Sequence, residues 1–155
     1  MSTLGDTVKV YRHLLEVVRK EKDILISANL EDLAENNRTK EAMLLKIQSL
    51  EASRIELINK FCTEQGMGKT DARLLELAVI FAGEKGDKLR NTHSVLTLLI
   101  KRVQEFNKQN ESLVQSALNT MNGAIDNVRD TLAGRPTYKK QGGMKPAENF
   151  GGQLV

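Results

Sequence analysis

The position of the prolines most limits what this chain can fold into. Both prolines of the 155-residue chain, Pro136 and Pro146, lie near its C-terminal end. Proline disrupts a helix because its ring clashes with the preceding turn and because it has no N–H to donate. Nowhere before residue 134 do β-branched and aromatic residues alternate with polar ones over a bounded run, which is the pattern of a half-buried strand. The first 133 residues are therefore predicted to be nearly all helix.

Apolar residues recur at helical spacing through the N-terminal half. From about Asp6 to Ala28 they alternate with charged residues such as Glu21, which predicts an amphipathic helix with its charges in solvent. Near "ISANLEDL" the stripe changes phase, so residues 6–64 form either one long kinked helix or two helices. Gly66 and Gly68 end this region, because glycine accepts the positive φ of a helix C-cap. The two stripes contain Val8, Tyr11, Leu15, Val18 and Leu25, then Leu30, Leu33, Met43, Leu44, Ile47, Leu50, Ile58 and Phe61.

A short apolar segment and a long patterned one follow. The segment around "LLELAVIFAG" predicts a short helix at about residues 71–82, and Gly83 and Gly86 are predicted to break the chain again. One uninterrupted pattern then runs from about Asp87 to Leu132 in steps mostly of three and four, as in a coiled coil. Its stripe contains Leu89, Leu96, Leu99, Val103, Phe106, Asn110, Leu113, Ala117, Met121, Ile125, Val128 and Leu132.

The last helix determines the predicted architecture. At 1.5 Å per residue it would be roughly 70 Å long, more than twice the width of a small domain, so it must pack along another long helix. Only residues 6–64 can supply one. We expect an all-α fold, an elongated antiparallel helical bundle made of a long N-terminal hairpin or kinked helix, a short bridging helix and a long C-terminal helix. Residues 1–133 form this bundle, and residues 134–155 form a flexible, disordered basic tail that contains glycine and proline.

One short motif suggests nucleotide binding. The stretch "EQGMGKTDARL", residues 64–74, contains the Gly-Lys-Thr that ends a phosphate-binding loop. The complete motif requires glycine at position 63, where this chain has Thr63. In phosphate-binding loops the motif also follows a buried strand, whereas "ASRIELINKFCTE", the segment before it here, has the pattern of a charged amphipathic helix. Lys69 is therefore not expected to bind nucleotide.

The distribution of charge argues against nucleic-acid binding. The net charge of the chain is +3, and residues 133–155 alone carry four basic side chains against one acidic one. The rest of the chain is formally neutral, whereas a duplex-binding domain concentrates lysine and arginine on a folded face. The longest apolar runs, "LAVIF" and "LTLLI", are too short to span a bilayer, and the N-terminus has no apolar run of signal-peptide length. We expect a cytoplasmic protein without membrane insertion.

No group of residues has the pattern of a catalytic or metal site. His13 and His93 lie far apart, and the acidic residues are interspersed with basic ones, as on a solvated helix face. The single cysteine, Cys62, excludes an internal disulfide and is expected to pack as a small apolar residue. We therefore expect neither enzymatic activity nor a cofactor.

The stretch "FNKQNESLVQSALNTMN" is more informative. Asn110 falls on the apolar stripe, where an amide either sets the register of the bundle or contacts a partner. Beyond it a broad apolar face continues almost to the tail, and its methionine and aliphatic side chains suit the docking of another amphipathic helix. Alternatively, the N-terminal helix of the same chain covers this face.

Several short patterns occur in an order that resembles the FlgN family of flagellar export chaperones. They are "LLEVVRKEKDIL", then Lys40, the leucine pair Leu44–Leu45, Arg54 and an Asn-x-x-Asn-x-x-Leu motif. The likeness covers most of residues 8–140, including "YKKQGG" after the last helix. Lys139 departs from the commoner family form, in which a glycine often follows the tyrosine.

The resemblance implies a cytoplasmic chaperone of type III flagellar secretion. Such chaperones bind the C-terminal amphipathic helices of hook-filament junction proteins of the FlgK and FlgL type, prevent premature assembly and deliver them to the export gate protein FlhA. Tyr138 would contact the export gate. The alternatives are a structural coiled-coil protein that self-associates through the same stripe and, third, a nucleic-acid adaptor that acts through the tail. The residues predicted to bind the partner are Asn107, Asn110, Leu113, Val114, Leu118, Met121, Ile125, Val128 and Leu132.

Overall fold

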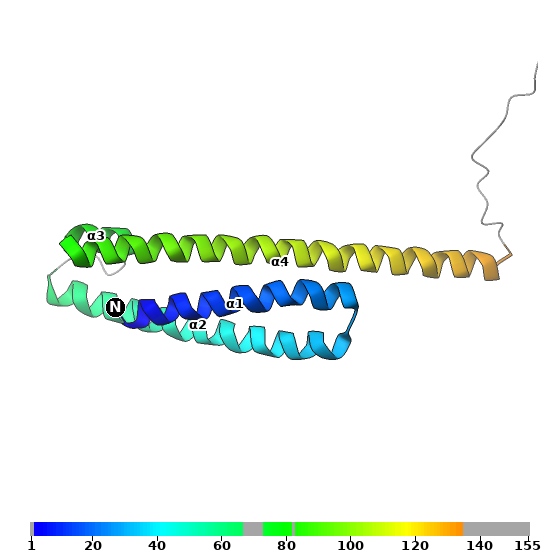
Figure 1. The fold of residues 1–155 in the computed structure, drawn as a ribbon, viewed down its shortest axis with the longest axis horizontal. Coiled ribbons are helices and arrows are strands. Elements are labelled where there is room, and N and C mark those ends of the chain that lie inside the picture. Colours follow the sequence, from blue (N-terminus) through cyan, green and yellow to red (C-terminus); the bar gives the residue numbers. More distant parts are fainter. Residues whose placement is uncertain (1, 67–72, 82, 135–155) are drawn as a thin grey trace, which may run out of the picture. The chain divides into compact units, whose positions relative to one another are not determined.

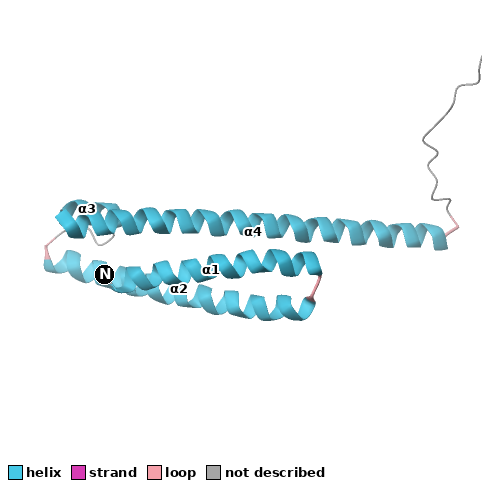
Figure 2. Ribbon diagram, viewed as in Figure 1, coloured by secondary structure: helices cyan, strands magenta, loops and turns pink. Residues whose placement is uncertain are grey.

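The described part of the chain consists of α-helices joined by short turns (Figures 1 and 2). The computed structural model describes residues 2–66, 73–81 and 83–134, and no strand occurs within these ranges. The all-α prediction is confirmed. The four helices are α1 (Ser2–Ser27), α2 (Leu30–Glu64), α3 (Leu74–Phe81) and α4 (Gly83–Leu132). The chain divides into two compact units, Met1–Gln115 and Ser116–Val155, and α4 contributes residues to both.

Residues 6–64 are two helices, which settles the alternative that the sequence left open. α1 ends before Ala28, whose φ of 53° places it in the left-handed region that non-glycine residues rarely adopt. Asn29 then caps α2, because its side-chain oxygen accepts hydrogen bonds from the backbone N–H groups of Glu31 and Asp32 at 3.1 and 3.2 Å. The change of phase near "ISANLEDL" therefore marks the turn of a helical hairpin.

In the first unit, α2 runs antiparallel to α1, and α4 runs parallel to α1 (Figure 1). Contacts establish these directions: Leu4, near the start of α1, packs on the cluster that contains Ile58 of α2 and Leu89 of α4. Farther along α1, Val18 accepts a hydrogen bond from Asn110. Residue numbers thus rise together in α1 and α4 and fall in α2. The first unit is a bundle in which α2 is antiparallel to both neighbours, as predicted.

Two apolar clusters form the core of this bundle. Cys62 is completely buried in the cluster near α3, so its predicted role as a small apolar core residue is confirmed. Val18, also with no exposed surface, belongs to the cluster between α1 and α4. Burying an aliphatic side chain is worth about 1.5–3 kcal/mol, which makes these clusters the main source of stability. The buried members are Ile58, Cys62, Leu77, Ala78 and Leu89 in the first cluster, and Leu14, Leu15, Val18, Leu99 and Val103 in the second.

The prediction that Gly86 breaks the chain is wrong. α4 already begins at Gly83, before the expected start near Asp87, and Gly86 lies buried inside it. A Cβ atom on residue 86 would lie 2.4 Å from the carbonyl oxygen of Ala78 in α3. Glycine is needed here because the backbone of α3 lies against that of α4, where no side chain fits. The observed α3 lies within the predicted range 71–82, whose residues 71, 72 and 82 are outside the described residues.

Glycine ends two of the helices. Gly66 has a φ of 64° and donates its N–H to the carbonyl of Thr63 at 3.1 Å, which confirms its predicted role at the end of α2. Gly68 lies outside the described residues. At the end of α4, Gly134 has a φ of 68° and closes the last turn in the same way. Beyond Gly134, the predicted disordered tail lies outside the described residues.

Candidate partner-binding surface

A buried polar network joins the three long helices of the first unit. Glu21 of α1 is 8% exposed, and its carboxylate accepts hydrogen bonds from Lys40 of α2 at 2.8 and 3.1 Å. The same carboxylate accepts a bond of 3.0 Å from the side-chain amide of Asn110 in α4. That amide also donates to the backbone carbonyl of Val18 at 2.9 Å. Because a buried charge is costly unless it is paired, the network favours one register of the three helices.

This network changes the interpretation of two residues. Asn110 is 4% exposed and its side-chain amide is hydrogen-bonded to α1, a position that is compatible with the register-setting role. Glu21, which the sequence placed among solvated charges, is a core residue. The local sequence does not indicate this burial, because the residues that stabilise the buried carboxylate, Lys40 and Asn110, are distant in the chain.

The next predicted residues lie at intermediate depth. Asn107 and Leu113 are half-buried. Phe106 packs on the second cluster and also lies under the guanidinium of Arg19, 5.1 Å from its ring centroid, an arrangement that attracts a cation to the ring. Contacts with α1 therefore cover much of this stretch of α4.

The remaining predicted residues are exposed along α4. We call them the α4 apolar row. Their exposed fractions run from 42% at Val114 to 83% at Leu132. Their spacing of alternating three and four residues places them on one face of the helix. The row consists of Val114, Leu118, Met121, Ile125, Val128 and Leu132.

Such a row is unusual on a helix without a partner. Single exposed apolar residues are common on soluble proteins, whereas large exposed apolar patches often belong to interaction sites. The other faces of this stretch carry mostly polar and charged residues, although Ala117, Gly123 and Ala124 are also there. Asp126 and Arg129 form an exposed pair at 3.9 Å. The arrangement is compatible with binding of the apolar face of another helix.

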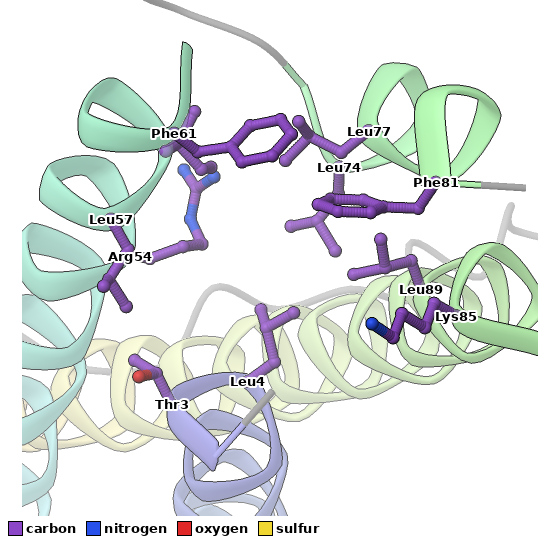
Figure 3. Close-up of a pocket in the computed structure, with 11 residues that line it drawn as sticks. Thr3, Leu4, Arg54, Leu57, Phe61, Leu74, Leu77, Phe81, Lys85 and Leu89 are labelled. Carbon is purple, nitrogen blue, oxygen red and sulfur yellow. The ribbon is translucent and has the colours of Figure 1, made fainter. Parts of the chain in front are cut away.

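The sequence missed a second apolar feature, a pocket of about 360 Å³ bordered by all four helices of the first unit. Leu4, Leu74 and Phe81 are among its lining residues (Figure 3). The high apolar content of "LLELAVIFAG" was its only signal. α3 contributes Leu74, Leu77 and Phe81 to the lining of the pocket.

The structure bears on the nucleotide motif through the segment before it. α2 continues as helix to Glu64, where a phosphate-binding loop would need a preceding strand. Residues 67–72, including Lys69, lie outside the described residues. Within the described ranges, no group of three or more histidine, cysteine or acidic residues could hold a metal ion. None of the described helices is both long and apolar enough to cross a membrane.

Comparison with known families decides what kind of protein this is. The model of one family, described as FlgN protein, matches residues 1–146. The chain belongs to the FlgN family. Neither the curated proteins nor the solved structures contain a match to it. The FlgN family consists of flagellar export chaperones.

In this FlgN-family chain, several polar residues that carried the resemblance serve the bundle itself. Lys40 pairs with Glu21, and Arg54 forms an ion pair with Glu51 one turn earlier in α2. Asn110 belongs to the same buried network as Lys40. Tyr138, predicted to contact the export gate, lies outside the described residues.

Proposed function

We propose that this FlgN-family chaperone binds the C-terminal amphipathic helices of hook-filament junction proteins of the FlgK and FlgL type. In the cytoplasm it would prevent their premature assembly and deliver them to the export gate protein FlhA, with Tyr138 as the contact. The exposed α4 apolar row is the observation that carries the proposal. An amphipathic helix laid along this row would bury apolar side chains on both partners.

The energetics require a long interface. Each aliphatic side chain that becomes buried contributes roughly 1.5–3 kcal/mol, and micromolar affinity requires about 8 kcal/mol. Ordering a mobile partner consumes part of that gain. Contacts along most of the row, from Leu118 to Leu132, are therefore needed. Asn107, Asn110 and Leu113, which precede the row along α4, are the remaining residues that we propose to take part in binding.

The test adds a charge to the row. Met121→Glu or Ile125→Glu should weaken binding of a peptide from a FlgK- or FlgL-type C-terminal helix at least tenfold, because a carboxylate cannot be buried there unpaired. Both side chains are more than half exposed, so helicity and thermal stability should remain nearly unchanged. Calorimetric titration gives the affinity and circular dichroism gives the fold.

The matched control is Asn127→Glu, which adds the same charge on another face of the helix and should leave affinity unchanged. If Met121→Glu unfolds the chain, the row is core and the site lies elsewhere. If it dissociates a homodimer and leaves binding of the export substrates intact, the structural coiled-coil alternative is correct.

A further inference from the structure

The pocket at the α3 end of the bundle has a buried floor and exposed walls. Ile58, Leu77 and Leu89, at its base, belong to the first core cluster and are at most 9% exposed. Leu57 and Phe81, in its walls, are 55% and 39% exposed. Its volume of about 360 Å³ lies within the range of pockets that hold ligands in proteins. Apolar side chains thus form a concave surface that the described residues leave unfilled.

The charged side chains that line this pocket within the described part of the chain are both positive. They are Lys85 of α4 and Arg54 of α2. Arg54 is partly neutralised by Glu51, at 2.8 Å in the same helix. Lys85, by contrast, has no ion-pair partner among the described residues. Figure 3 shows its ammonium group turned toward the pocket. The site therefore favours an apolar ligand that also carries a carboxylate.

We propose that this pocket binds an acidic, leucine-rich peptide segment, at a site made of different residues from the α4 apolar row. The pocket is open on one side, as the exposure of Leu57 and Phe81 shows. An enclosed site buries most of a small ligand, whereas an open one suits side chains that project from a peptide whose other face remains in water. Apolar side chains of the peptide fill the base, and a neighbouring carboxylate pairs with Lys85. The proposal does not rest on the identity of the export substrate.

The probe is a short synthetic peptide of leucine and glutamate, with the leucines at helical spacing. A second peptide has lysine in place of each glutamate. Calorimetric titration of the full chain at low ionic strength should show at least fivefold tighter binding of the acidic peptide. Amide exchange in α3 should slow when that peptide binds, because α3 forms one wall. Equal affinity for the two peptides would overturn the proposal.

Two variants locate the site. Lys85→Glu should reverse the preference, so that the lysine peptide binds at least fivefold more tightly than the acidic one. This variant should fold normally, because residue 85 is exposed and a glutamate in the first turn of α4 interacts favourably with the helix dipole. Leu57→Ser should weaken binding of both peptides, and the acidic peptide should still bind more tightly than the lysine peptide.

A variant outside the pocket separates this site from the proposed substrate surface. Met121→Glu should leave the affinity of the acidic peptide unchanged. If Met121→Glu abolishes that binding and Lys85→Glu does not alter it, the peptide binds the α4 apolar row and the pocket proposal is wrong. Loss of junction-protein binding in Met121→Glu, with acidic-peptide binding retained, supports both sites independently.

Discussion

Replacement of Gly86 by alanine should have two opposite effects on stability, a gain from helix propensity and a loss from packing against α3. Alanine in the interior of a helix is favoured over glycine by about 0.8–1.0 kcal/mol, so Gly86→Ala should stabilise α4 if nothing else changed. The new Cβ, however, would lie 2.4 Å from the carbonyl oxygen of Ala78. That oxygen belongs to the backbone of α3 and cannot rotate away. α3 must therefore shift as a unit or separate from α4.

The cost of that shift exceeds the gain in propensity. Overpacking a well-packed contact costs about 1–3 kcal/mol. Movement of α3 also strains the 3.3 Å hydrogen bond from Arg90 to Ala78 and the burial of Leu77, a side chain 6% exposed. If Leu77 becomes exposed, roughly 1.5–3 kcal/mol is lost. We expect Gly86→Ala to lower the free energy of unfolding by about 1–2 kcal/mol net of the propensity gain, since a partial shift limits both costs.

The matched control is Gly5→Ala in α1, where a Cβ atom would meet nothing within 4 Å. This substitution should raise stability by up to about 1 kcal/mol. Urea denaturation followed by circular dichroism gives both values, and amide exchange in residues 74–81 should accelerate only in Gly86→Ala. If Gly86→Ala proves as stabilising as the control, with exchange in α3 unchanged, the close approach of α3 and α4 does not exist in solution.

Two further predictions concern polar groups of the bundle. Glu21→Ala leaves Lys40 and the amide of Asn110 without their carboxylate. Because Lys40 retains some access to water, urea denaturation should show a free energy of unfolding lower by about 2–3 kcal/mol, less than the 3–5 kcal/mol typical of a fully buried pair. A variant as stable as the parent would show that the network is not formed. Burial, and then the negative charge of Glu51, raise the pKa of Tyr11 above its ordinary 10.0, so its contribution to stability is complete below pH 10 and is lost as the pH rises toward the folded-state pKa. Tyr11→Phe should reduce the fall in melting temperature above pH 10, and an unchanged profile would contradict this assignment.

The sequence predicted the helices better than the contacts between them. The absence of proline before Pro136 and the regular apolar spacing depend on local physics, and Gly66 acts where such reasoning placed it. Gly86 was wrongly predicted to break the chain because its role depends on contact with α3. A glycine at a helix break and a glycine at a close contact between two helices look the same in the local sequence. Glu21 was misread for a related reason, since its charge is stabilised by residues distant in sequence.

The candidate surface was predictable only in part. Helical spacing identified the apolar face from Leu113 to Leu132, but spacing alone does not tell whether another helix covers it. The structure shows Leu113 half-buried and the residues from Val114 onward exposed. The α3 pocket could not be anticipated, because its walls come from segments whose proximity is a property of the folded bundle.

The complete burial of Cys62 supplies a built-in measure of how often one end of the bundle opens. Because the chain has a single cysteine and the folded state leaves its thiol no exposed surface, a thiol-reactive dye can modify it only in molecules whose α2–α3 end has opened. At low dye concentration, the ratio of the labelling rate to that of an unstructured cysteine peptide gives the equilibrium constant for opening. The native chain can thus report, without an introduced cysteine, whether a ligand closes this end.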